Sequence, residues 1–128
     1  MLTSPADLVA RAKATIHECS VMDVHECLTP DTLLIDIREP AEYAKAHIPG
    51  SAYLPRGLLE FEIHGLVEKH NDKPGIANAD VPIILYCGTG GRSALAAETL
   101  QHMGYRDVRS LSGGMVAWRE AGLAIETA

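Results

Sequence analysis

Residues 81–93 of the chain read Val-Pro-Ile-Ile-Leu-Tyr-Cys-Gly-Thr-Gly-Gly-Arg-Ser, with the thiol of Cys87 at their centre. The apolar run Ile83–Tyr86 has the length and the β-branched residues of a buried strand, and it ends at the cysteine. Glycines follow at once, and beyond Arg92 the apolar residues recur at helical spacing. The segment therefore predicts a strand, a glycine-rich loop and a helix. The thiol lies at the carboxyl end of the strand, where open α/β sheets usually bind ligands.

Strands and helices alternate along the rest of the sequence. Ser4 and Pro5 suit the cap and the first position of a helix, which we expect over residues 5–18 as an N-terminal extension of a single domain, 1–128. We expect strands at 33–37, 52–54, 83–86 and 107–111. We expect further helices at 21–28, 40–45, 58–70, 92–103 and 115–120. This alternation predicts an α/β fold, a mostly parallel sheet with helices on both faces.

The composition restricts the cellular setting and the partners. The net charge is −6 and no basic run occurs, so we expect no nucleic-acid partner. No apolar run approaches the roughly 20 residues of a membrane span, and the N-terminus lacks the layout of a signal peptide, so we expect a cytoplasmic protein without membrane contact. The three cysteines fit no disulfide pattern, and a reducing compartment would keep Cys87 available as a thiol.

The loop after Cys87 has the chemistry to favour a thiolate. A free cysteine has a pKa of about 8.5 and is mostly protonated at neutral pH. The start of the following helix directs unpaired N–H groups and the positive end of its dipole at the loop, and glycines allow successive amides to turn inward. Arg92 would either add positive charge or anchor the loop through an acidic partner such as Asp36 or Glu39. Cys87 is thus a candidate nucleophile, the alternative being a small thiol buried at a strand end.

Four blocks of the sequence resemble, in the same order, the signature motifs of the rhodanese (sulfurtransferase) family. The loop Cys87–Ser93 is similar to the active-site loop, in which cysteine and arginine bracket four residues. The other blocks are Leu34–Pro40 with Glu42-Tyr43, Ala46–Ala52 with Ala46 in place of the family's glycine, and Leu111–Trp118 with its Gly-Gly-x-x-x-Trp pattern. The blocks cover about residues 31–122.

This resemblance implies a rhodanese-like three-layer domain with a central five-stranded sheet. It implies that Cys87 takes a sulfane sulfur from a donor such as thiosulfate, becomes a persulfide, and passes the sulfur to a thiophile such as cyanide or a thiol. A protein acceptor is a further partner that fits. The residues expected to bind substrate are Gly88, Thr89, Gly90, Gly91, Arg92, Ser93, Arg38 and Arg56, with Asp36 and His47 as structural support. No metal or organic cofactor is implied.

The sequence departs from the family in ways that leave the donor open. Many thiosulfate-using members carry a second basic residue within the loop, whereas residues 88–91 are uncharged. The opening Cys-Gly-Thr-Gly resembles the mercaptopyruvate-using branch, which does not share Arg92-Ser93. Arg38 and Arg56 are the candidates to supply the missing charge, and a structural ion pair is the alternative for Arg38.

Other activities remain as alternatives. A phosphatase of the same fold has one more residue between its cysteine and arginine, where this chain has four, so phosphatase or arsenate reductase activity is less favoured. A non-catalytic or regulatory module that carries a persulfide is a further alternative. The pairs His17/Cys19 and His25/Cys27 suggest zinc, but we expect them on two different helices and predict no metal site.

Overall fold

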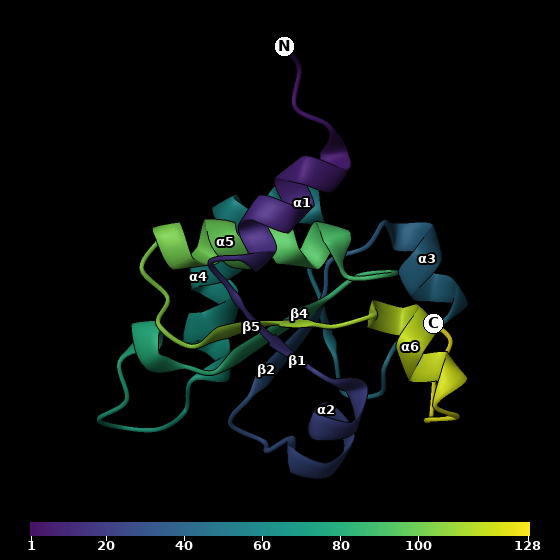
Figure 1. Cartoon of the computed structure of the whole chain (residues 1–128). Helices are drawn as coiled ribbons and strands as arrows, with labels where there is room; N and C mark the ends of the chain where they lie inside the picture. Colours follow the sequence, from purple (N-terminus) through teal and green to yellow (C-terminus); the bar gives the residue numbers. More distant parts are fainter.

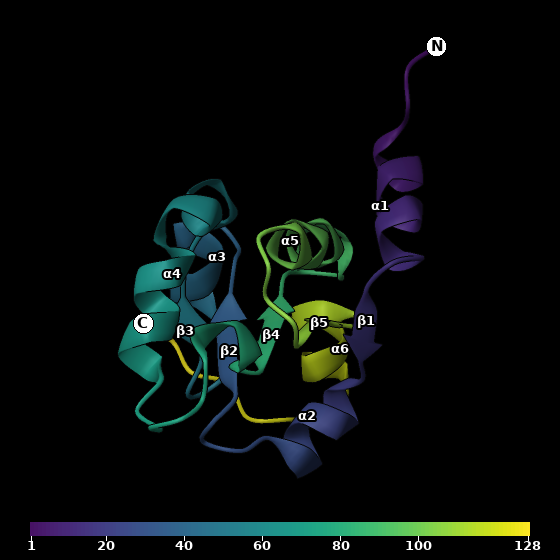
Figure 2. The ribbon, with the colours of Figure 1, turned by 90° about the vertical axis from the view of Figure 1, so that its left-hand side faces the viewer.

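The computed structural model describes all 128 residues and contains one sheet of five parallel strands. The strands are β1 His17–Cys19, β2 Leu33–Asp36, β3 Ala52–Tyr53, β4 Ile83–Tyr86 and β5 Val108–Leu111. Their order in the sheet is β1-β5-β4-β2-β3, so β4 is central (Figure 2). The predicted α/β class is confirmed.

Helices cover both faces of this sheet. They are α1 Pro5–Lys13, α2 Val21–Cys27, α3 Pro40–Lys45, α4 Leu59–His70, α5 Gly91–His102 and α6 Gly114–Glu120, with 3₁₀ turns at Arg56–Leu58 and Asn78–Asp80. Figures 1 and 2 show α1, α4 and α5 on one side of the sheet and α2 and α6 on the other. None of these helices is long and apolar enough to cross a membrane.

The strand β4 divides its side chains between two buried clusters. Ile83 and Leu85 pack in the larger cluster with apolar residues of α4 and α5, and Cys87 belongs to the same cluster. Ile84 and Tyr86 pack in the second cluster with residues of α2 and α6. This alternation follows from the pleat of the strand. It places the Cys87 side chain on the face of the sheet that α5 covers.

The predicted helix over residues 5–18 is wrong in its second half. The helix α1 begins as predicted, with the Asp7 amide donating to Ser4 Oγ at 3.0 Å, but it ends at Lys13. His17–Cys19 instead forms the edge strand β1, in register with residues 109–111 of β5. Hydrogen bonds to a neighbouring strand outweigh the weak helical pattern, in which Ile16 continues the apolar face of Leu8 and Ala12.

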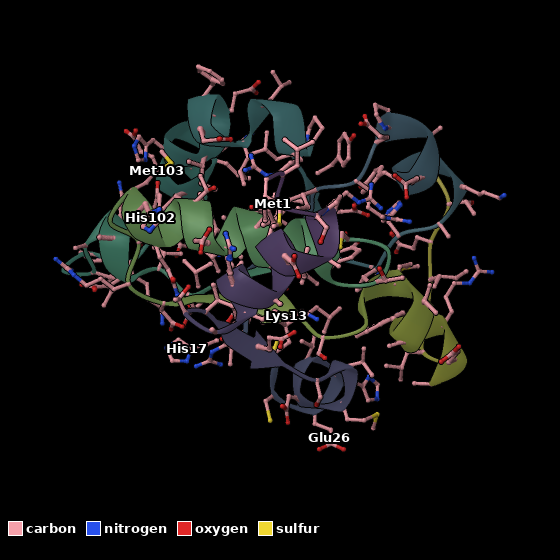
Figure 3. The ribbon with its side chains drawn as sticks, turned by 45° about the horizontal axis from the view of Figure 1, so that its top comes forward. Met1, Lys13, His17, Glu26, His102 and Met103 are labelled. Atoms are coloured by element: carbon pink, nitrogen blue, oxygen red, sulfur yellow. The ribbon has the colours of Figure 1, made fainter.

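The helix α1 packs on the domain and does not extend freely from it. Ala12 is fully buried, and the Thr15 hydroxyl donates to Glu98 Oε2 of α5 at 3.4 Å. In Figure 3, α1, with Lys13 at its end, lies beside the half of α5 that is remote from His102. That half contains the start of α5, next to the Cys87 loop.

Candidate active site

The loop between β4 and α5 encloses the thiol of Cys87, which is only 1% exposed. Gly90 is the N-cap of α5 and has φ +107°, a conformation in which a side chain would be strained. A Cβ at this position would also lie 3.4 Å from the amide nitrogen of Gly113. Glycine at position 90 therefore lets the chain turn tightly from the strand into the helix around the sulfur.

Three hydrogen-bonding groups of this loop surround the Cys87 sulfur. The amide of Gly90 donates to Sγ at 3.1 Å, the amide of Ser93 donates at 3.4 Å, and Ser93 Oγ lies 3.5 Å away. Burial raises the pKa of the Cys87 thiol, but hydrogen bonds from the Ser93 hydroxyl and amide and from the amides of Gly90 and Thr89 outweigh it and lower the pKa. The site therefore favours a thiolate, as expected for a nucleophile.

The start of α6 binds the outer side of the same loop. The Met115 amide donates to the Cys87 carbonyl at 2.9 Å, and the Val116 amide donates to the Gly88 carbonyl at 3.0 Å. These are first-turn amides, which have no partner within their own helix. With its carbonyls held by α6, the loop presents amide groups to the sulfur. The sequence indicated a glycine pair before a helix here but gave no sign of this contact.

Arg92 anchors the loop to α3 through Glu42. Its Nη1 and Nη2 donate to Glu42 Oε1 and Oε2 at 2.8 and 3.0 Å, a two-point pair at the surface. The hydrogen bonds from Arg92 lower the Glu42 pKa to about 2, against a smaller effect of burial. The loop is thus anchored through an acidic partner, but this partner is neither of the two residues given as examples: Asp36 is paired with Arg38, and Glu39 is the N-cap of α3.

Replacing Glu42 by glutamine should destabilise the fold in a pH-dependent way. At about pH 7 we expect a loss of roughly 0.5–1 kcal/mol, the range for partly exposed pairs. Folding lowers the Glu42 pKa, so the pair stabilises the fold above the ordinary glutamate pKa of about 4.3, and this contribution is lost as the pH falls toward about 2. Urea unfolding of both proteins between about pH 7 and about pH 3 should show their difference shrink.

The exposed Glu62 of α4 provides the control for this experiment. Its replacement by glutamine should change the free energy of unfolding by less than about 0.5 kcal/mol at each pH. A difference between wild type and Glu42→Gln that stays constant from about pH 7 to about pH 3 would contradict the role of the carboxylate.

Arg38 and Asp36 form a buried ion pair at the end of β2. Arg38 Nη2 donates to Asp36 Oδ2 at 2.8 Å, and the side chains are 7% and 0% exposed. Nη2 also donates to the carbonyl of Ala46, so Arg38 ties β2 to the chain beyond α3. These contacts agree with the alternative in which Arg38 forms a structural ion pair. A contact between Arg38 and substrate stays a prediction.

Arg56 and His47 also have partners within the fold. Arg56 donates to Glu60 Oε1 at 2.7 Å and to Thr99 Oγ1 at 3.2 Å. No hydrogen bond joins Arg56 to the Cys87 loop, and its contact with substrate stays a prediction. The His47 Nδ1 donates to the Tyr43 carbonyl at 3.0 Å, and its ring stacks on that of Tyr43.

The two His-x-Cys pairs lie on different elements, although not on two helices as predicted. His17 and Cys19 belong to β1, and His25 and Cys27 belong to α2. No group of three or more His, Cys, Asp or Glu side chains has the arrangement of a metal site.

Known proteins resemble this chain in sequence and in structure. The family model "Rhodanese-like domain" matches residues 20–121. A sulfurtransferase of Allochromatium vinosum is 36% identical over 97 residues, which are 76% of this chain and 80% of that protein. The thiosulfate sulfurtransferase GlpE of Pseudoalteromonas translucida is 37% identical over 91 residues, which are 71% of this chain and 76% of that protein.

A solved structure from Rhodopseudomonas palustris covers nearly the whole chain. That protein is described as being of unknown function and a possible tyrosine phosphatase. It superposes with a TM-score of 0.79 at 33% identity and covers 98% of this chain and 96% of its own. The family model matches most of the chain, and two relatives are sulfurtransferases. Both findings agree with the α/β fold and the cysteine loop described above. The chain therefore belongs to the rhodanese-like sulfurtransferase family of transferase enzymes.

Proposed function

We propose that this chain moves a sulfane sulfur from a donor such as thiosulfate or mercaptopyruvate to a thiophile such as cyanide or a thiol. Cys87 is the catalytic residue and carries the sulfur as a persulfide. One observation supports this role above the others: the Cys87 sulfur lies among the amides of Gly90 and Ser93 at the start of α5. Such a site favours a negative charge on sulfur both before and after the transfer.

The reaction with thiosulfate has two displacement steps. In the first, the Cys87 thiolate attacks the outer sulfur of thiosulfate, an S–S bond forms, and the S–S bond of the donor breaks so that sulfite leaves with the electron pair. In the second, cyanide attacks the terminal sulfur of the persulfide, thiocyanate leaves, and the Cys87 thiolate is restored. Both steps begin from an anionic nucleophile, and neither needs an external oxidant or reductant.

The backbone of residues 88–93 is the proposed cradle for the transferred sulfur. Cations near the loop are already paired, Arg92 with Glu42 and Arg38 with Asp36. Because a carboxylate offsets each of these cations, we expect a bound anion to depend mainly on the amide groups of the loop, which carry only partial charge. Binding of the donor should then depend more on the shape of the loop than on a free positive side chain.

A phosphatase is the second candidate, favoured by the description of the Rhodopseudomonas palustris protein. Four residues separate Cys87 from Arg92, which gives a smaller loop than in phosphatases of this fold. Arg92 is also held by Glu42 at both of its terminal nitrogens, and this carboxylate would compete with a phosphate for them. We therefore expect no hydrolysis of p-nitrophenyl phosphate above that of a Cys87→Ser variant.

Intact-protein mass after exposure to a donor tests the proposed function. The reduced protein is incubated with thiosulfate or with mercaptopyruvate, the donor is removed, and the mass is recorded before and after cyanide. We expect the mass to rise by one sulfur atom and cyanide to remove it, with thiocyanate as the product. The peptide that carries Cys87 should hold the added sulfur, which separates this site from Cys19 and Cys27.

Two results would contradict the proposal. The first is a protein that takes up no cyanide-labile sulfur from thiosulfate, from mercaptopyruvate or from polysulfide, which would favour a binding or regulatory module. The second is phosphate-ester hydrolysis that depends on Cys87, which would favour the phosphatase.

A further inference from the structure

A buried hydroxyl lies directly behind the active-site loop, on the strand β5. Ser110 is 0% exposed, and it pairs in register with Leu85 of β4 on one side and with Glu18 of β1 on the other. Its side chain is on the face of β5 that α5 covers, the same face as the buried Val108. A core position of this kind is usually apolar, because a buried hydroxyl without a partner is destabilising.

The Ser110 hydroxyl has one hydrogen-bond partner, the hydroxyl of Ser93. The two oxygens are 2.7 Å apart, and Ser93 Oγ is in turn 3.3 Å from the Gly90 carbonyl and 3.5 Å from the sulfur of Cys87. The proton of Ser110 has no acceptor other than Ser93 Oγ. When Ser110 donates to Ser93, the proton of Ser93 is left for the Gly90 carbonyl or for the sulfur.

The charge on the sulfur decides between these two acceptors. A thiolate attracts the Ser93 proton more strongly than a neutral carbonyl does, because a hydrogen bond to an ionised acceptor is about twice as strong. A hydroxyl that accepts one hydrogen bond also becomes a better donor in the next, so the bond from Ser110 strengthens the bond from Ser93 to the sulfur.

We propose that Ser110 is a positioning residue that directs the Ser93 hydroxyl at the Cys87 thiolate through a chain of two buried hydroxyl groups. The inference rests on the proposed role of Cys87 as the reacting group. Ser110 does not touch the substrate. It acts through Ser93 alone, so its effect should depend on the Ser93 hydroxyl.

The pH profile of Cys87 alkylation tests this dependence. Iodoacetamide reacts with the thiolate, and the modified peptide that contains Cys87 is followed by mass spectrometry, so that Cys19 and Cys27 do not contribute. In Ser110→Ala we expect the profile to move to higher pH, with alkylation roughly three- to tenfold slower at about pH 6. In a Ser93→Ala background, the further change Ser110→Ala should have no effect on the profile.

Three further measurements separate positioning from a structural role. Ser112→Ala, the same change at an exposed serine just beyond β5, should keep the wild-type profile. Ser110→Thr retains a hydroxyl and should restore the wild-type profile even if its added methyl lowers the melting temperature. The double variant Ser93→Ala/Ser110→Ala removes both hydroxyls, so neither is left buried without a partner, and we expect this variant to fold.

An unchanged profile in Ser110→Ala would overturn the proposal. The proposal would also be overturned if Ser110→Ala shifted the alkylation profile equally in the wild-type protein and in the Ser93→Ala background. These outcomes differ from a failure of the proposed function, because alkylation does not require sulfur transfer. A shifted profile in a protein that takes up no sulfur would contradict the sulfurtransferase, whereas an unchanged profile in a protein that forms the persulfide would contradict only the role of Ser110.

Discussion

Cys87→Ser should lose sulfur transfer by more than about a thousandfold, the scale seen when the nucleophile of a covalent mechanism is removed. The serine hydroxyl is protonated at neutral pH, and the hydrogen bonds that stabilise a thiolate do not ionise it. The measurement is the rate of thiocyanate formation from thiosulfate and cyanide. The added sulfur should also be absent from the mass of this variant.

The fold should survive this substitution. The oxygen of serine can accept the hydrogen bonds from Gly90 and Ser93 that the sulfur accepts, so no buried donor loses its partner. The melting temperature should therefore remain close to that of the wild type. Cys27→Ser, at an exposed cysteine of α2, is the matched control and should retain full activity. A Cys87→Ser protein that is folded and transfers sulfur would refute the assignment of the nucleophile.

Gly114→Ala should damage both stability and activity. Gly114 has φ +55°, and a Cβ there would lie 2.4 Å from the Cys87 carbonyl oxygen and 2.7 Å from that of Gly88. The added methyl must displace backbone, so we expect a loss of about 2–5 kcal/mol in the free energy of unfolding, from backbone strain together with overpacking. In the fraction that folds, the carbonyls lose their positions on α6, and sulfur transfer should fall by at least about tenfold.

Gly65→Ala provides a control with the same chemical change. Gly65 lies within α4, where an added Cβ meets nothing within 4 Å. Alanine there should stabilise the protein by about 0.5–1 kcal/mol and leave the rate unchanged. Chemical denaturation measures the stability of both variants, and the rate of thiocyanate formation measures their activity. If Gly114→Ala were as stable and as active as the wild type, the close packing of α6 on the loop would not matter for the site.

The parts of this site that sequence could predict are those encoded by neighbouring residues. A strand that ends at Cys87, glycines that permit a tight turn, and a helix that begins near Arg92 follow one another in the chain, and the structure has them in that arrangement. The predicted N-cap at Ser4 is local in the same way, because its hydroxyl accepts from the Asp7 amide, three residues further along the chain, at 3.0 Å.

The parts that sequence could not predict depend on contacts across the fold. The strand β1 is only three residues long and exists because β5 lies beside it. Arg92 pairs with Glu42, whereas Asp36 is held by Arg38, and spacing along the chain reveals neither pairing. Ser110 gave one weak signal, a serine at a core-facing position of a strand. Its meaning depends on Ser93, which lies 17 positions away in sequence.

The order of the strands has a consequence for the time course of folding. Cys19 of β1 contacts Ser110 of β5 across 91 positions of the chain, and α6, which holds the loop carbonyls, follows β5. Closing so long a segment is entropically costly and slows the formation of non-local contacts. A chain emerging from the ribosome would carry Cys87 before the strand and helix that enclose it were made. The thiol would therefore pass through an unprotected interval, in which it is open to oxidation and its loop lacks the helix that binds the carbonyls of Cys87 and Gly88.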